Sequence, residues 1–126
     1  MLTDVLKGTF TASYGTGQGL GLDNDMPAAG KTGTTNSSKD TWFCGYTRYY
    51  TTAIWVGYDT PRAMPGIYGK TYAGKIWKQV MDQIHEGKEP LDWEQPATVE
   101  MTTDSKSGIT DLFSATLHER AEQSLH

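Results

Sequence analysis

A lysine and three threonines gather around two glycines at residues 30–35, which read Gly-Lys-Thr-Gly-Thr-Thr. If this run forms a β-strand, Lys31 and Gly33 share one face and Thr32 and Thr34 share the other, because side chains alternate along a strand. A local twist that brings both sets to the rim of a cleft would offer ammonium and hydroxyl donors together to a carboxylate. Gly33 has no Cβ, so a second backbone can approach closely, as an extended peptide does when it adds to a sheet edge. The pattern predicts a strand that binds the anionic end of a peptide.

The same residues allow a nucleotide-binding hypothesis, because Gly-Lys-Thr at residues 30–32 matches the end of a phosphate-binding P-loop. The first glycine of that motif would fall on Asp25, whose carboxylate would repel phosphate. A P-loop also needs a helix directly after the lysine, and residues 33–36 are a poor helix start. The glycines at residues 15–21 miss the G-x-G-x-x-G spacing of a dinucleotide site and are typical of a flexible loop. We therefore favour a peptide as the ligand.

Three strands are expected to position these residues, at residues 30–35, 41–48 and 51–58, with a turn at residues 36–40. Short connections predict an antiparallel meander. The second and third strands are apolar on both faces, which is typical of a middle layer covered by helices on both sides. Thr35 is expected to end the first strand and to pack its β-branched side chain there.

Two helices are expected beside the sheet. Residues 1–7 look like the last turns of a helix that Gly8 ends. From Thr71 to His85 a second set of residues recurs at helical spacing, and Gly87 followed by Pro90 ends this helix. The recurring residues are Ala73, Ile76, Trp77, Val80, Met81 and Ile84. This amphipathic helix is expected to lie across the sheet.

The chain of 126 residues divides by charge and packing near Pro90. Residues 1–88 carry seven acidic and nine basic side chains, whereas residues 89–126 carry eight acidic and two basic ones. The mild positive balance of the first part falls short of a nucleic-acid footprint. The second part has little periodicity and is expected to be an acidic linker or a loosely attached C-terminal appendage.

The remaining reactive residue types suggest no further site. Cys44 is the single cysteine, which excludes an internal disulfide, and its apolar neighbours predict a small buried residue rather than a reactive thiol. His85, His118 and His126 are scattered and expected on the solvated surface. Neither a metal site nor a cofactor is predicted. No stretch approaches the roughly 20 apolar residues of a membrane span.

Several runs, in order, resemble the class A penicillin-binding proteins, a family of bifunctional peptidoglycan synthases. They are DVLKGT at residues 4–9, GTG at 15–17, AGKTGTTN at 29–36, DTWFCGYT at 40–47, IWVGYD at 54–59 and IW at 76–77. K-T-G is one of the signatures of this family. The resemblance covers residues 1–88 and implies the C-terminal half of a transpeptidase domain. It implies an α/β (α+β) fold of the serine transpeptidase/β-lactamase type, in which a central antiparallel sheet is flanked by helices. This chain would supply three strands and the C-terminal helix.

The resemblance implies serine acyl transfer. A serine attacks the D-Ala-D-Ala carbonyl of a peptidoglycan stem peptide, D-alanine leaves, and the acyl group passes to the amine of a neighbouring stem. The family match implies catalytic roles for Lys31, in the proton relay, and for Thr34, whose N–H supplies half of the oxyanion hole. It implies substrate binding by Thr32, Gly33 and Thr34, with the two hydroxyls on the carboxylate of the substrate or of a β-lactam. The wider roles implied are cell-wall biogenesis, cell shape and β-lactam resistance.

One departure from the family decides how the chain is interpreted. The sequence contains neither S-x-x-K nor S-x-N, so the nucleophile and the second motif are absent, as is the family's glycosyltransferase domain. We expect a fragment whose partners are the remaining part of the enzyme, stem peptides and β-lactams, and not nucleic acid. Either the polypeptide is divided within the transpeptidase domain with the other piece still bound, or this piece occurs alone. We favour the first, because a lone half would expose a large apolar face.

Two expectations complete the hypothesis. The complete enzyme would act on the extracytoplasmic face of the bacterial plasma membrane, anchored by an upstream segment absent from this chain. The alternative is a non-catalytic peptidoglycan-binding module of the same fold. The intact Lys31, Thr32 and Thr34 argue against it, because a pure binding protein need not keep the oxyanion geometry.

Overall fold

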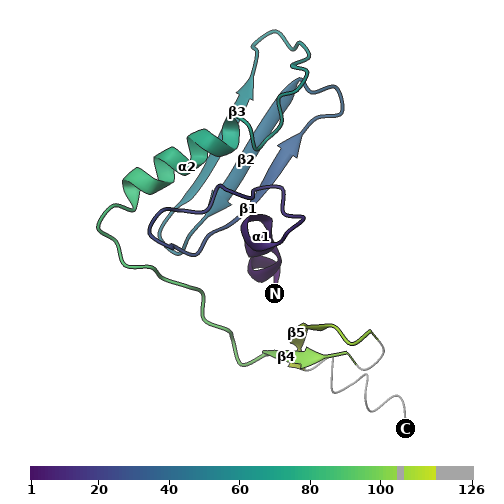
Figure 1. Cartoon of the computed structure of the whole chain (residues 1–126), viewed down its shortest axis with the longest axis vertical. Coiled ribbons are helices and arrows are strands. Elements are labelled where there is room, and N and C mark those ends of the chain that lie inside the picture. The colour runs from purple at the N-terminus through teal and green to yellow at the C-terminus, as the bar shows by residue number, and fades with distance from the viewer. Residues whose placement is uncertain (105–106, 116–126) are drawn as a thin grey trace. The chain divides into compact units, whose positions relative to one another are not determined.

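The computed structural model describes residues 1–104 and 107–115, which fall into a larger unit, Leu2–Asp92, and a smaller one that begins at Trp93 (Figure 1). The larger unit contains α1 (Leu2–Thr11), β1 (Ala29–Thr34), β2 (Asp40–Tyr46), β3 (Thr51–Gly57) and α2 (Ala73–Ile84). Its strands form one antiparallel sheet in the order β1-β2-β3. The predicted meander is confirmed, as is the second helix.

The core lies on one face of the sheet, where both helices pack (Figure 1). Phe43 of β2 is fully buried, and its ring centroid lies 5.0 Å from that of Trp77 on α2 and 5.9 Å from that of Phe10 on α1. A Cβ on Gly45 would meet the Trp77 ring at 2.6 Å, so the indole needs a glycine beneath it. Met81 is fully buried one turn further along α2. Aromatic packing across β2 therefore holds the helices to the strands.

The first helix extends beyond its expected end. Gly8 lies inside α1, and the helix continues to Thr11, so the prediction that Gly8 ends it was wrong. Thr9 is buried, and the Phe10 ring stacks 5.6 Å from Trp77. These contacts outweigh the roughly 1 kcal/mol by which glycine disfavours a helix interior.

The other face of the sheet is open. Side chains along β2 alternate, with Thr41 and Phe43 buried under the helices and Trp42 and Cys44 exposed on the opposite face. Trp42 pairs across the strands with Trp55, and the two are 43% and 42% exposed. The expectation that helices cover both faces does not hold within the described residues. The prediction of a buried Cys44 was also wrong, because Cys44 points to the open face.

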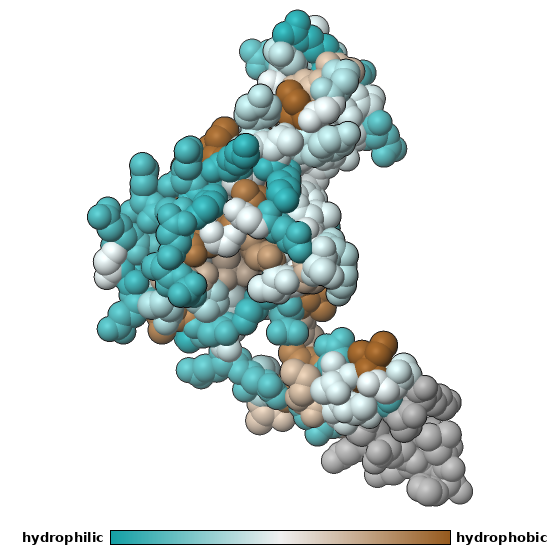
Figure 2. All heavy atoms as spheres, in the orientation of Figure 1, coloured by the Kyte–Doolittle hydropathy of each residue, from teal (hydrophilic) through white to brown (hydrophobic). Residues whose placement is uncertain are grey.

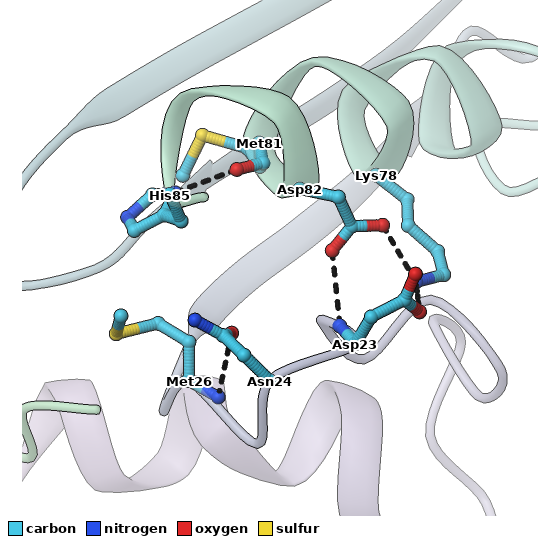
Figure 3. A network of polar contacts seen from close by, with 7 residues as sticks. All are labelled: Asp23, Asn24, Met26, Lys78, Met81, Asp82 and His85. Carbon is cyan, nitrogen blue, oxygen red and sulfur yellow. Dashed lines mark hydrogen bonds and ion pairs between the residues drawn. The ribbon is translucent and has the colours of Figure 1, made fainter. Parts of the chain in front are cut away.

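The loop before β1 is fixed to α2 by charged groups. The ammonium of Lys78 forms ion pairs with Asp23 in the loop and with Asp82 one turn further along the helix (Figure 3). Asp82 also accepts the backbone N–H of Asp23 at 3.0 Å.

Over α2, hydrophilic side chains cover most of the surface, and the apolar groups there are small and separate (Figure 2). Three residues expected in the apolar stripe are accordingly partly exposed, namely Ile76, Val80 and Ile84.

The turn between β1 and β2 is closed by Thr35. This residue follows the last residue of β1 and is exposed, so its expected place within the strand was wrong. Its hydroxyl accepts the backbone N–H groups of Lys39 and Asp40, each at 3.1 Å. Thr35 therefore acts as a turn residue.

His85 lies at the end of α2 and is only 1% exposed, so the expectation of a solvated surface histidine was wrong. Its Nδ1 lies 2.7 Å from the carbonyl oxygen of Met81, and its Nε2 lies 2.8 Å from the hydroxyl of Thr47. That hydroxyl also accepts the N–H groups of Tyr49 and Tyr50. The network ties the end of α2 to the β2–β3 turn. His118 and His126 lie outside the described residues.

The smaller unit contains an antiparallel hairpin, β4 (Val99–Thr103) and β5 (Thr110–Ser114), which the sequence did not predict. Asp104 closes it, because its carboxylate accepts the N–H of Ser107 and its carbonyl accepts the N–H of Gly108. Gly108 has a φ of 68°, a conformation that favours glycine. Among the described residues, neither unit contains a helix of the length and hydropathy needed to span a bilayer.

Candidate functional site

The Lys-Thr-Gly-Thr run lies on β1, at an outer edge of the three-stranded sheet. The register places Lys31 opposite Cys44 and Gly33 opposite Trp42, on the open face. Thr32 lies opposite Phe43 and thus on the face that the helices cover. The predicted alternation of the candidate residues along the strand is therefore observed.

Although Lys31 lies on the open face, its ammonium reaches the hydroxyl of Thr32 on the other face. Its Nζ donates to the carbonyl oxygen of Thr32 at 3.0 Å and to the Thr32 hydroxyl at 3.4 Å. Lys31 is exposed and Thr32 is partly buried. A positive charge and a hydroxyl from opposite faces therefore meet at the rim of the sheet, where an anion could contact both.

Thr32 contacts a second hydroxyl that the sequence did not single out. Its Oγ1 donates to the Oγ1 of Thr16 at 2.9 Å. Thr16 belongs to the glycine-rich loop after α1, which was expected to be flexible. The contact joins that loop to the candidate site.

Thr34 is held by the segment that leads into α2. Its hydroxyl oxygen accepts the backbone N–H of Gly69 at 3.3 Å, which leaves the hydroxyl proton available to an outside acceptor. A Cβ on Gly69 would lie 2.4 Å from the carbonyl oxygen of Trp42 and 3.0 Å from the Cβ of Thr32. Gly69 therefore allows this segment to pack directly on the strand.

The two glycines of β1 differ in what surrounds them. A Cβ on Gly30 would meet the carbonyl oxygen of Cys44 at 2.9 Å, so packing alone requires a glycine there. A Cβ on Gly33 would meet only the Cβ of Trp42, at 3.4 Å, which is close to ordinary contact. The packing of the sheet therefore does not require a glycine at position 33.

Other kinds of site do not fit the observed geometry. Gly30 to Thr34 lie in a strand, and a hairpin turn follows them rather than a helix, so the strand–loop–helix arrangement of a P-loop is not formed. Across residues 1–104 and 107–115, no cluster of histidine, cysteine and carboxylate side chains could hold a metal ion. A hollow of about 440 Å³ at the end of α2, lined by Asp23, Asp82 and Lys88 among others, contains none of the candidate residues. The candidate site is an open strand edge.

Comparison with known proteins gives a consistent result, although no family model matches the chain. Penicillin-binding protein 1A of Clostridium acetobutylicum is 39% identical over 105 residues, which cover 83% of this chain and 12% of that protein. Penicillin-binding protein 1A of Pseudomonas aeruginosa is 40% identical over 111 residues, covering 86% of this chain and 13% of that protein. The homologues of this chain are penicillin-binding proteins 1A.

The chain spans only 12–13% of the length of these penicillin-binding proteins 1A, so it corresponds to a partial segment of them. The crystal structure of penicillin-binding protein 1A from Haemophilus influenzae aligns with a TM-score of 0.74 over 90% of this chain and 19% of that chain. At 22% identity this likeness establishes the fold. The expected fold class, an antiparallel sheet with helices packed on it, is confirmed.

Proposed function

We propose that this chain supplies one wall of the active site of a peptidoglycan D,D-transpeptidase, and that the rest of the enzyme supplies the nucleophile. The observation that carries the proposal is the cluster on β1, where the Lys31 ammonium meets the hydroxyl of Thr32 at an open strand edge. The two penicillin-binding proteins 1A described above support the same reaction class. A groove around the substrate would form only when the missing part of the enzyme packs beside this strand.

In the proposed reaction, a serine of the missing part attacks the carbonyl of the penultimate D-alanine. The carbonyl oxygen becomes an oxyanion, and the N–H of Thr34 stabilises it. Collapse of this intermediate breaks the peptide bond, and the departing D-alanine takes a proton through the relay that Lys31 supports. The amine of a second stem peptide then attacks the acyl-serine, which restores the serine hydroxyl. The hydroxyls of Thr32 and Thr34 hold the terminal carboxylate throughout.

A β-lactam would enter the same site. Its carboxylate occupies the place of the terminal carboxylate of the stem peptide, and the serine opens its strained ring. Gly33 leaves space over the open face of the strand, so either ligand can lie close to the backbone.

We infer that the missing part packs on the open face of the sheet. Lys31, Cys44 and Trp42 all lie on this face, and Trp42 and Trp55 expose two indole rings beside each other, with centroids 6.4 Å apart. The helices already cover the opposite face. A serine that works with Lys31 must lie on the lysine's side, and burial of the two indoles would stabilise the assembly.

Cys44 reports on this packing because it is the single cysteine and lies beside Lys31 on the open face. A maleimide should label Cys44 rapidly in the isolated chain and at least tenfold more slowly once the complementary piece is bound. The matched control carries Cys44→Ala together with Gln79→Cys, at an exposed position on α2. Equal labelling of Cys44 with and without the partner would overturn the inferred interface.

The role of Lys31 tests the proposed function itself. In the complete enzyme, Lys31→Ala should lower the rate of acylation by a fluorescent penicillin by a factor on the order of 10² to 10⁴, the range typical of a lost acid–base or oxyanion partner. Lys39→Ala, at an exposed lysine of the neighbouring turn, is the control and should react as the wild type does. Unchanged acylation of the Lys31 variant would contradict the assignment.

We further propose an organisation for the complete protein. Residues 1–88 form the C-terminal half of its transpeptidase domain, and residues 89–126 form an acidic appendage. The complete enzyme carries a glycosyltransferase domain and a membrane anchor, and it works on the extracytoplasmic face of the plasma membrane. The homologues support this proposal, since most of their length lies outside the aligned segment.

A further inference from the structure

The loop that contains Thr16 is built to hold one position. Gly15 lies so close to α1 that a Cβ there would meet the carbonyl oxygen of Thr9 at 2.4 Å, and one on Gly17 would meet the Thr9 methyl group at 2.9 Å. The N–H of Gly17 donates to the carbonyl oxygen of Thr9 at 2.9 Å, and that of Gly15 donates to Ala12 at 2.8 Å. The two glycines therefore allow the loop to pack on the end of α1. The side chain of Thr16, between them, points toward Thr32 of β1.

Lys31, Thr32 and Thr16 form a chain of hydrogen bonds in which each residue donates to the next. Lys31 donates to Thr32, and Thr32 donates its only hydroxyl proton to Thr16. A hydroxyl has one proton, so Thr32 has none left for a ligand while this bond is formed. Within the described residues, the Thr16 hydroxyl makes no other hydrogen bond, so the free proton of the chain Lys31–Thr32–Thr16 belongs to Thr16.

We propose that Thr16 is a substrate-binding residue, and that its hydroxyl donates to the carboxylate of the stem peptide or β-lactam beside Thr34. The proposal rests on the proposed function and revises its donor set, because Thr16 takes the place of Thr32 as the donor beside Thr34, while Thr32 passes the polarising effect of Lys31 to Thr16. The ligand class follows from the chemistry, since a positive charge behind a row of hydroxyl donors favours an anionic acceptor. Thr16 thus contributes to selectivity for a free carboxylate.

The test compares two probes on the complete enzyme, a β-lactam with a free carboxylate and the methyl ester of the same compound. Thr16→Val removes the hydroxyl with little change in shape and should lower the second-order acylation rate for the carboxylate probe by about 10- to 100-fold, the loss expected for a hydrogen bond to a charged group. The rate for the ester should stay within about threefold, since the ester lacks the charge. Thr16→Ser should restore the carboxylate rate.

The outcomes separate this proposal from the proposed function. A wild-type enzyme that neither probe acylates would refute the proposed function. A reactive wild type whose Thr16→Val variant loses rate equally on both probes, or on neither, would overturn the role of Thr16. Should the ester react too slowly to time, failure of Thr16→Ser to restore the rate would overturn it as well. Ser13→Ala, at an exposed position of the same loop, is the control and should match the wild type.

Discussion

Gly33→Ala should separate ligand binding from folding. The new Cβ would lie 3.4 Å from the Cβ of Trp42 and would meet nothing closer, and the backbone of Gly33 is outside the left-handed region. Alanine also loses less conformational entropy than glycine when it enters a strand. The free energy of unfolding should therefore change by no more than about 1 kcal/mol, and in the stabilising direction.

The same methyl group should obstruct the ligand. It projects from the open face beside Lys31, where we propose that the peptide lies along β1. A displacement of the ligand by about 1 Å can cost on the order of 10²-fold in rate. Acylation of the complete enzyme by a fluorescent penicillin should therefore fall by roughly 10²-fold, whereas its urea midpoint should be unchanged or higher.

A matched substitution tests the structural reasoning. In Gly45→Ala the Cβ would lie 2.6 Å from the buried Trp77 ring, so the core must shift, which costs about 1–3 kcal/mol. The unfolding midpoint of this variant should fall clearly, in contrast to that of Gly33→Ala. Normal acylation by the Gly33→Ala enzyme would refute the claim that Gly33 faces the ligand.

Two further predictions concern the packing of α2. Thr47→Val should destabilise the chain by about 1–3 kcal/mol in urea denaturation, because it leaves the buried His85 Nε2 and two backbone N–H groups without their partner. The control is Thr52→Val, which loses only a contact with the Met81 sulfur. Equal destabilisation by the two substitutions would contradict this account. Burial lowers the pKa of Lys78, but hydrogen bonds from its ammonium to Asp23 and Asp82 raise it by more, so the net pKa lies above the ordinary 10.5. A pKa raised on folding adds stability that is present below the unfolded value and lost as the pH rises through the folded one. Above about pH 10.5, the free energy of unfolding of the wild type should therefore fall more steeply with pH than that of Lys78→Met. An equal fall in both proteins would show that the ion pairs contribute nothing.

The sequence predicted the parts of the fold that local patterns encode. The spacing of apolar residues from Ala73 onward located α2, and the short connections between apolar runs indicated the meander. Alternation along a strand also placed Lys31 and Thr32 on opposite faces. Each of these features depends on periodicity, which a single sequence carries.

The features that the sequence missed depend on contacts between distant residues. Gly8 remains helical because Phe10 packs on Trp77, 67 positions away along the chain. His85 is buried because Thr47 and the Met81 carbonyl satisfy both ring nitrogens. Neither partner could be identified from spacing.

The contacts around the candidate site were predicted incompletely for the same reason. Thr16 enters it through a contact with Thr32, 16 residues later, and Gly69 through one with Thr34. The signal was nevertheless present in the Gly-Thr-Gly run, where two glycines flank a polar residue. The glycines of this loop are better interpreted as allowing close packing on α1 than as making the loop flexible.

The central claim is that this chain carries half of a catalytic site, and one measurement tests it most directly. The purified chain and its complex with the serine-bearing piece are each incubated with a fluorescent penicillin and analysed by intact-mass spectrometry. We predict no adduct on the isolated chain, and in the complex an adduct on the serine-bearing piece alone. A covalent penicillin adduct on the 126-residue chain itself would contradict the account.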